Sequence, residues 1–144
     1  MMSKYDLERF IKVQNGGGYD LALKEIKAGK KCSHWIWYIF PQLKGLGFSY
    51  KSQYYGIENI EEAREYLAHS VLGARLIEIS EALLNLQESD PFIVMGGSPD
   101  DMKLQSCMTL FANVSENGSV FHRVLEKFFD GKMDSKTLKL LSGK

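Results

Sequence analysis

The sequence predicts an all-α fold, a single compact and mainly helical domain of about seven helices over residues 1–144. Apolar residues recur at spacings of three and four along most of the chain, and helix-capping residues precede several of these segments. No low-complexity tract, internal repeat or linker divides the chain. A domain of roughly 150 residues buries about two-thirds of its unfolded surface, so we expect a sizeable core.

Two helices are expected near the N-terminus. The first covers residues 1–14, and it lacks the apolar stretch of a signal peptide. The second runs through 21–26 and ends before Gly29. The glycine run 16–18 separates them as a turn or hinge, and no lysine-serine pair follows it, so it is a poor phosphate-binding loop. One face of the first helix carries Leu7, Phe10, Ile11 and Gln14.

The middle of the chain holds the strongest helix signal. Residues 44–56 are rich in glycine and aromatic side chains without a clear period, which indicates an ordered loop or a short irregular strand. Asn59 followed by Glu62 resembles a capping box and opens a helix. Ser70 can cap the next helix, in which Gly73 permits the close approach of another backbone. The apolar stripe of that helix consists of Leu72, Leu76, Ile79, Leu83 and Leu86.

Three further helices are expected toward the C-terminus, each opened by a polar cap. Ser98 is a candidate N-cap with Pro99 at the first helical position, and this helix runs through Leu104, Met108 and Phe111. Ser119 caps a helix that ends at Gly131. Asp134 starts a short terminal helix through Leu138 and Leu141.

The charge balance argues against two classes of partner. Lysine plus arginine equals aspartate plus glutamate at 18 each, so no excess positive field attracts nucleic acid or an anionic membrane. No segment approaches the ~20 apolar residues needed to span a bilayer. We expect a cytoplasmic protein whose two cysteines, Cys32 and Cys107, stay as thiols. The basic cluster of Lys27, Lys30 and Lys31 is interpreted as a solvated helix end.

The run from His34 to Gln42 is the first candidate for a functional site, because it holds both tryptophans and one of the three histidines. His34 is the candidate catalytic acid or base, since an unperturbed imidazole titrates near ~6.5; the alternative is a buried histidine bonded to backbone. Trp35 and Trp37 are candidate platforms for a flat ligand, although on a helix they diverge by roughly 200° and only one would line a pocket. The alternative for both is core packing. Phe40 and Gln42 complete the proposed ligand-binding residues of this run.

A second candidate region supplies an anion contact. Lys103, Ser106 and Thr109 follow one another at spacings of three and present an ammonium and two hydroxyls on one helical face; plain solvent exposure is the alternative. A Cys32–His34 nucleophile pair lacks a third group to orient it. The histidines are far apart and show no metal-ligand spacing, so we expect no metal and no cofactor.

The segments 29–37 and 40–47 resemble a family of small bacterial proteins of unassigned function, with the signature H-W-x-W-x-x-F-P-Q at residues 34–42. Some members of that family carry the label calpastatin-like. The resemblance continues to residue 131 and covers nearly the whole chain. It implies a mostly α-helical single domain and supplies no reaction. Cys32 departs from the small or basic residue expected at its position.

Two functions from different classes are compatible with these residues. The first is a cytosolic protein that binds, and can hydrolyse, a small nucleotide-like or anionic metabolite at a pocket lined by histidine and tryptophan, through N-glycosidic or phosphoester cleavage. The second is a non-catalytic interaction module that uses the glycine- and tyrosine-rich surface of residues 45–56. A concave pocket containing His34 and Lys103 favours the first function, and a flat patch favours the second.

Overall fold

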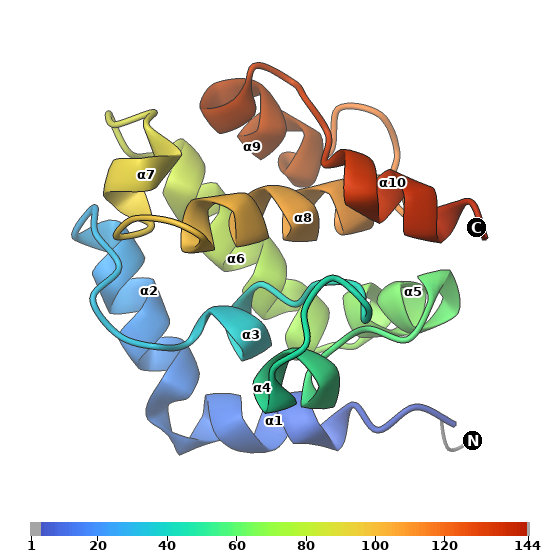
Figure 1. The fold of residues 1–144 in the computed structure, drawn as a ribbon. Coiled ribbons are helices and arrows are strands. Elements are labelled where there is room, and N and C mark those ends of the chain that lie inside the picture. Colours follow the sequence, from blue (N-terminus) through green and yellow to red (C-terminus); the bar gives the residue numbers. More distant parts are fainter. Residues whose placement is uncertain (1–3, 144) are drawn as a thin grey trace.

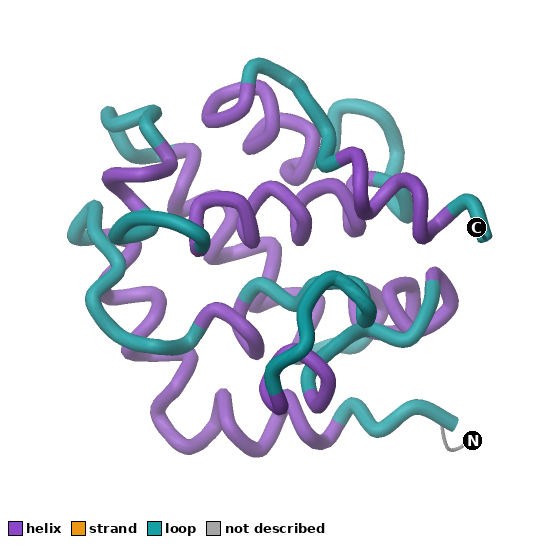
Figure 2. The backbone as a smooth tube through the Cα atoms, in the orientation of Figure 1, coloured by secondary structure: helices purple, strands orange, loops and turns teal. Residues whose placement is uncertain are grey.

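The all-α prediction is confirmed. The computed structural model describes residues 4–143, and within this range helices are joined by loops and no strand is present apart from one isolated bridge between Leu43 and Ile57 (Figure 2). The α-helices are α1 (Glu8–Val13), α2 (Tyr19–Lys27), α3 (Ile36–Ile39), α4 (Tyr50–Tyr54), α5 (Ile60–Ala68), α6 (Leu72–Leu84), α7 (Pro91–Val94), α8 (Asp100–Ala112), α9 (Val120–Phe129) and α10 (Ser135–Leu141). Seven of these ten helices have six or more residues, and they correspond to the predicted seven.

Helix α8 occupies the centre of the molecule. It packs against α3, α5, α7, α9 and α10, while α6 packs against α2, α5 and α9 (Figure 1). Aromatic rings connect these helices within the core: the Phe111 ring on α8 lies 5.5 Å from Tyr66 on α5 and 5.8 Å from Phe121 on α9. Because α8 is buried along most of its length, the side chains at its N-terminal end are held on a rigid support.

Three of the predicted N-caps are confirmed. The Asn59 side chain accepts a hydrogen bond from the Glu62 backbone N–H (3.0 Å), and the Glu62 carboxylate accepts one from the Glu58 N–H (2.7 Å). Ser119 caps α9 and Asp134 caps α10 in the same way. Each of these signals is local in sequence, which is why the residue pattern was sufficient to find them.

Two other cap predictions are wrong. The N–H groups at the start of α6 bond to Nδ1 of His69 rather than to Ser70, at 3.1 Å for Val71 and 3.2 Å for Leu72. At the start of α8, Pro99 holds the N-cap position without a side-chain cap, and the Ser98 hydroxyl donates instead to the Asp101 carboxylate (2.6 Å). In both places a neighbouring side chain offers a better-placed partner than the predicted serine.

The first predicted helix is present, but its first residue differs from the prediction. The helix expected over 1–14 begins at Glu8, and residues 1–3 lie outside the described residues. The glycine run forms a kinked π-helical turn, Gln14–Gly18, in which Gly17 takes a φ of 102°. This kink turns the chain from α1 into α2 (Figure 1).

The segment 44–56 differs from its predicted loop or strand. Residues Tyr50–Tyr54 form the short helix α4, because Ser49 caps it by accepting from the Ser52 N–H (3.2 Å). Arg9 then fixes the end of the segment by donating from Nε to the Tyr54 carbonyl (2.7 Å) and from Nη2 to the Gly56 carbonyl (2.9 Å). The aromatic side chains therefore stand on an ordered segment.

The two cysteines lie in different surroundings. Cys32 is an exposed free thiol, and Cys107 is a buried free thiol whose pKa is raised by burial. None of the helices in residues 4–143 is both long and apolar enough to cross a bilayer.

Candidate functional site

Two grooves meet at one pair of side chains, Trp37 on α3 and Lys103 on α8. The first, which we call the Gln42 groove, has a volume of about 250 Å³ and is lined by Trp37, Gln42, Leu46, Gly47, Pro99, Met102, Lys103, Ser106, Asp134 and Lys136. The second, the His34 groove, has a volume of about 240 Å³ and is lined by Lys31, His34, Ile36, Trp37, Lys51, Asp100 and Lys103. The candidate acid or base His34 and the candidate anion contact Lys103, which come from two separate regions of the sequence, both line the His34 groove.

Trp37 and Lys103 are in direct contact. The Lys103 Nζ lies 4.1 Å from the centroid of the Trp37 ring, which is a cation–π geometry. The same ammonium lies 3.3 Å from Oδ1 of Asp100, one helical turn earlier on α8. An aromatic face and a cation therefore lie next to one another where the two grooves join.

Asp100 carries a second, more buried ion pair. Its Oδ2 lies 2.7 Å from the Nζ of Lys31, whose side chain is only 5% exposed. Lys31 also donates to the Ser33 carbonyl (2.5 Å) and lies over the Trp35 ring. The interpretation of Lys31 as part of a solvated helix end is therefore wrong, because α2 ends at Lys27 and Lys31 turns back toward α8.

The grooves carry an excess of positive charge. Lysines 31, 51, 103 and 136 line them together with His34, against two carboxylates. One of these carboxylates, that of Asp134, is already engaged in capping α10. Its Oδ2 accepts hydrogen bonds from the N–H (2.9 Å) and the hydroxyl (2.6 Å) of Thr137. Since clustered charges of one sign in a concave surface attract ions of the other sign, the grooves suit an anionic ligand.

His34 is exposed, and the residues on either side of it are bound by Glu25 on α2. The Glu25 carboxylate accepts from the N–H groups of Cys32 (2.8 Å) and Ser33 (3.0 Å), from the Ser33 hydroxyl (2.5 Å) and from Nε1 of Trp35 (2.8 Å). Burial acts to raise the pKa of Glu25, but these hydrogen bonds outweigh it and lower the pKa to about 2. The imidazole therefore extends from a fixed segment.

Glu25 makes the free energy of unfolding depend on pH in the acidic range. Its pKa in the folded protein, about 2, lies below the usual 4.5, so the ionised form stabilises the fold above pH 4.5 and this contribution is lost as the pH falls toward 2. We expect the Glu25→Gln variant to lose less stability than the wild-type protein between pH 5 and pH 2. Thermal unfolding followed at a series of pH values tests this, and parallel curves for the two proteins would contradict it.

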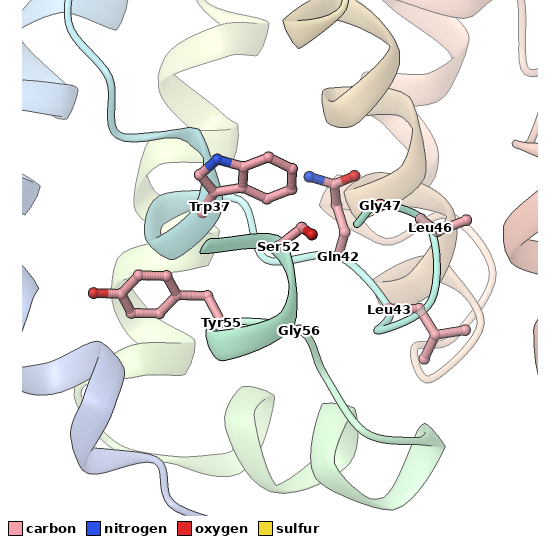
Figure 3. A pocket seen from close by; sticks show the side chains of 8 residues that line it. All are labelled: Trp37, Gln42, Leu43, Leu46, Gly47, Ser52, Tyr55 and Gly56. Carbon is pink, nitrogen blue, oxygen red and sulfur yellow. The ribbon is translucent and has the colours of Figure 1, made fainter. Parts of the chain in front are cut away.

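Gln42 lies between the Gln42 groove and a smaller cavity of about 10 Å³. Figure 3 shows its amide beside the Trp37 ring, with the Ser52 hydroxyl nearby. The residue is 6% exposed, and its Nε2 has no hydrogen-bond partner. Its backbone is fixed, because the Gln42 carbonyl accepts from the Ile57 N–H (2.8 Å).

The two predicted hydroxyls have different surroundings. Ser106 lines the Gln42 groove, and its Oγ donates to the Met102 carbonyl (3.2 Å). Thr109 is fully buried and does not line the groove. Its hydroxyl donates to the Gln105 carbonyl (2.8 Å) and accepts from the Asp134 N–H (2.8 Å), which holds the start of α10 beside the groove.

Trp35 and Phe40 lie in the core and line neither groove. Their rings are 6.0 Å apart, and both side chains are fully buried. The segment is helical from Ile36, which turns Trp37 away from Trp35 and toward the grooves. The expectation that only one tryptophan of a helical run lines a pocket agrees with this arrangement.

Several groove residues were not among the sequence candidates. Asp100 could have been found from the sequence, because it precedes Lys103 by three residues on a predicted helix and that spacing favours an ion pair. The others carry no local signal of a site, because tertiary packing alone brings their segments together; they are Lys31, Ile36, Pro99, Met102, Asp134 and Lys136.

The glycine- and tyrosine-rich surface of residues 45–56 borders the grooves through Leu46, Gly47 and Lys51. Its most prominent side chains are Phe48, which is 92% exposed, and Tyr50, which is 77% exposed. The Tyr50 ring is stacked on that of Tyr54, with centroids 5.7 Å apart.

Comparisons with known proteins identify relatives without a stated activity. A family model described as "Protein of unknown function (DUF1810)" matches residues 4–141. Among solved structures, the chain is similar to the conserved hypothetical protein Rv1873 from Mycobacterium tuberculosis, with a TM-score of 0.92 and 40% sequence identity. The match covers 97% of this chain and 99% of that chain. No curated protein matches.

Proposed function

The chain belongs to the DUF1810 family of proteins of unknown function, and we propose that it binds a small, flat, anionic metabolite of the nucleotide class in the two grooves. The observation that carries the proposal is the contact between the Trp37 ring and the Lys103 ammonium at the junction of the grooves. An aromatic face beside a cation matches a ligand in which a flat ring is joined to an anionic group.

The dimensions of the site support a ligand of this size. Each groove, at about 250 and about 240 Å³, is slightly smaller than the roughly 300–1,000 Å³ of typical small-molecule sites. A ligand that spans the Trp37–Lys103 junction would use both. Its ring then lies in the Gln42 groove, and its anionic group faces the lysines and His34 of the other groove.

The proposal includes hydrolysis, with His34 as the acid or base. Lys31, Lys51 and Lys103 line the same groove as this imidazole, so a phosphoryl group held there lies next to it. Phosphoester cleavage fits this arrangement: water adds to phosphorus, the ester P–O bond breaks, and the imidazolium supplies the proton to the departing oxygen. Both protons of the water stay on the phosphate that is released, and the imidazole regains its proton from solvent. The cytoplasm is the compartment we propose, because an exposed thiol such as Cys32 persists in a reducing environment.

The binding step is tested by thermal unfolding in the presence of AMP, GMP, CMP, UMP, ribose 5-phosphate and small organic acids. A ligand at ~100 times its dissociation constant adds about 2.7 kcal/mol, which raises Tm by roughly 5–10 °C. We expect the Lys103→Met variant to lose this rise. Lys12→Met, on the exposed side of α1, is the matched control and should keep it. No Tm rise with any of the compounds would contradict the proposal.

The His34→Ala variant separates catalysis from binding. Because the His34 side chain is exposed, its removal should change the free energy of unfolding by less than ~0.5 kcal/mol. Release of inorganic phosphate from the nucleoside monophosphate that binds best should fall by roughly 10²- to 10⁴-fold. His122→Ala, on α9 and outside both grooves, should leave the rate unchanged. Equal rates in His34→Ala and wild type would remove His34 from the reaction.

A second candidate function is protein interaction through residues 45–56. It is favoured by the exposure of Phe48 and Tyr50, which exceeds that of the other large hydrophobic side chains described. The Phe48→Ser, Tyr50→Ser double variant should abolish such an interaction and leave nucleotide binding intact. Loss of nucleotide binding in this variant would instead assign these side chains to the ligand site.

A further inference from the structure

We infer that the Gln42 amide is the specificity contact of this site: it reads the edge of the ligand's ring, as a nucleobase edge is read, by donating from Nε2 to a ring acceptor. This inference rests on the proposed function and adds to it which part of the ligand is recognised and by which chemistry. Its starting point is an unpartnered amide nitrogen on a side chain that is only 6% exposed.

A buried amide without a hydrogen bond costs folding free energy, so its presence at a groove needs a reason. Among the described residues, the only other buried side-chain atom without a partner is the Ser80 hydroxyl on α6. Ser80 lines neither groove, whereas Gln42 lines one of them. Gln42 thus combines an unsatisfied, buried donor with a position in the wall of a groove where a ligand can lie.

The backbone that carries the amide is held in place before any ligand arrives. The hydrogen bond from Ile57 N–H to the Gln42 carbonyl, and the one from Lys44 N–H to the Ile57 carbonyl, are both 2.8 Å long. They join residues 42–44 to the segment that Arg9 fixes at Gly56. A donor on so rigid a support loses little entropy when it binds, which favours specificity.

The small cavity behind Gln42 does not remove the need for a ligand. Its volume, about 10 Å³, is at the lower limit for a single water molecule. The Gln42 groove is about 25 times larger at about 250 Å³, and Trp37 lines it with Gln42. A flat ring that stacks on the indole would place its edge within reach of the amide.

The chemistry of the amide identifies the class of ring. A glutamine side chain presents a donor and an acceptor next to each other, which pairs with an edge that carries an acceptor beside a donor, as the adenine edge does. Ribose 5-phosphate carries no flat ring that could stack on Trp37 and present such an edge to Gln42. Gln42 should therefore discriminate between a nucleoside monophosphate and ribose 5-phosphate, while the lysines bind the phosphate of both.

The test compares the dissociation constants of AMP, GMP, CMP, UMP and ribose 5-phosphate, measured by calorimetry for wild type and Gln42→Met. For the nucleoside monophosphate that binds best, we expect the variant to bind roughly 10- to 100-fold more weakly. Its affinity for ribose 5-phosphate should stay unchanged. Its Tm should stay equal or rise, because the unpartnered amide is gone. Ser80→Ala, which removes the other unpartnered group, should alter neither affinity.

Other outcomes overturn the inference in distinguishable ways. If Gln42→Met weakens the binding of nucleotides and of ribose 5-phosphate equally, Gln42 contacts the phosphate. If Gln42→Met has a lower Tm and the near-isosteric Gln42→Glu keeps full nucleotide affinity, Gln42 is a structural residue. If wild type binds ribose 5-phosphate as tightly as every nucleotide, the inference fails while anion binding stands. If wild type binds none of the five compounds, the proposed function fails as well.

Discussion

The Glu62→Gln variant should lose about 3–5 kcal/mol of the free energy of unfolding. Glu62 and Arg9 form an ion pair of 2.9 Å, in which their side chains are 2% and 9% exposed. Neutralising Glu62 leaves the Arg9 guanidinium buried without its counter-charge. It also disturbs the bond from the Glu58 N–H that completes the cap of α5. Urea unfolding of the two proteins measures the loss.

The neighbouring Glu61 provides the matched control. It pairs with Lys4 at 3.5 Å, but both side chains are more than half exposed, so Glu61→Gln should leave the urea midpoint nearly unchanged. Because Arg9 also holds the Tyr54 and Gly56 carbonyls, Glu62→Gln should loosen the wall of the grooves and weaken nucleotide binding as well. Similar urea midpoints for the Glu61 and Glu62 variants would contradict a stabilising role for the buried pair.

The Gly73→Ala variant should be destabilised by about 3 kcal/mol, which corresponds to a fall in Tm of roughly 10 °C. A Cβ at this position would lie 1.9 Å from the Leu67 backbone oxygen, where no flexible side chain can move aside. The helix propensity gained by replacing glycine, about 1 kcal/mol, is too small to offset that clash. Separation of α5 from α6 is the expected structural response.

The adjacent Ala74 is exposed, so the reverse change, Ala74→Gly, measures the propensity effect alone and should cost no more than about 1 kcal/mol. Scanning calorimetry of both variants provides the comparison. A Tm of Gly73→Ala equal to or above that of wild type would show that the two helices are not in the close contact described here.

Local signals in the sequence account for most of the fold. The spacing of apolar residues in 72–86 and the caps Asn59, Ser119 and Asp134 predicted helices that are present. Prediction failed where two neighbouring side chains could cap the same helix, as at the start of α6, where His69 and not Ser70 accepts the backbone N–H groups. It also failed at α4, where closely spaced aromatic side chains obscured a five-residue helix that depends on Ser49.

The candidate site was predicted in part. His34, Trp37, Gln42, Lys103 and Ser106 line the grooves, because a site residue in a distinctive local pattern can be recognised without a structure. The sequence does not state which residues of an aromatic run face inward, so the core side chains Trp35 and Phe40 were included with Trp37. The Lys31–Asp100 pair joins segments about 70 residues apart, and no local pattern indicates it.

The two tryptophans allow a direct measurement of ligand binding in the grooves. In ¹H–¹⁵N NMR spectra, each indole N–H gives one cross-peak, and the Trp35 indole is bonded to Glu25 inside the core while Trp37 lines both grooves. During titration with AMP, GMP, CMP or UMP, we expect the Trp37 indole peak to move and saturate while that of Trp35 stays in place. If no nucleotide moves the Trp37 peak at millimolar concentration, the grooves are not the binding site for a metabolite of this class.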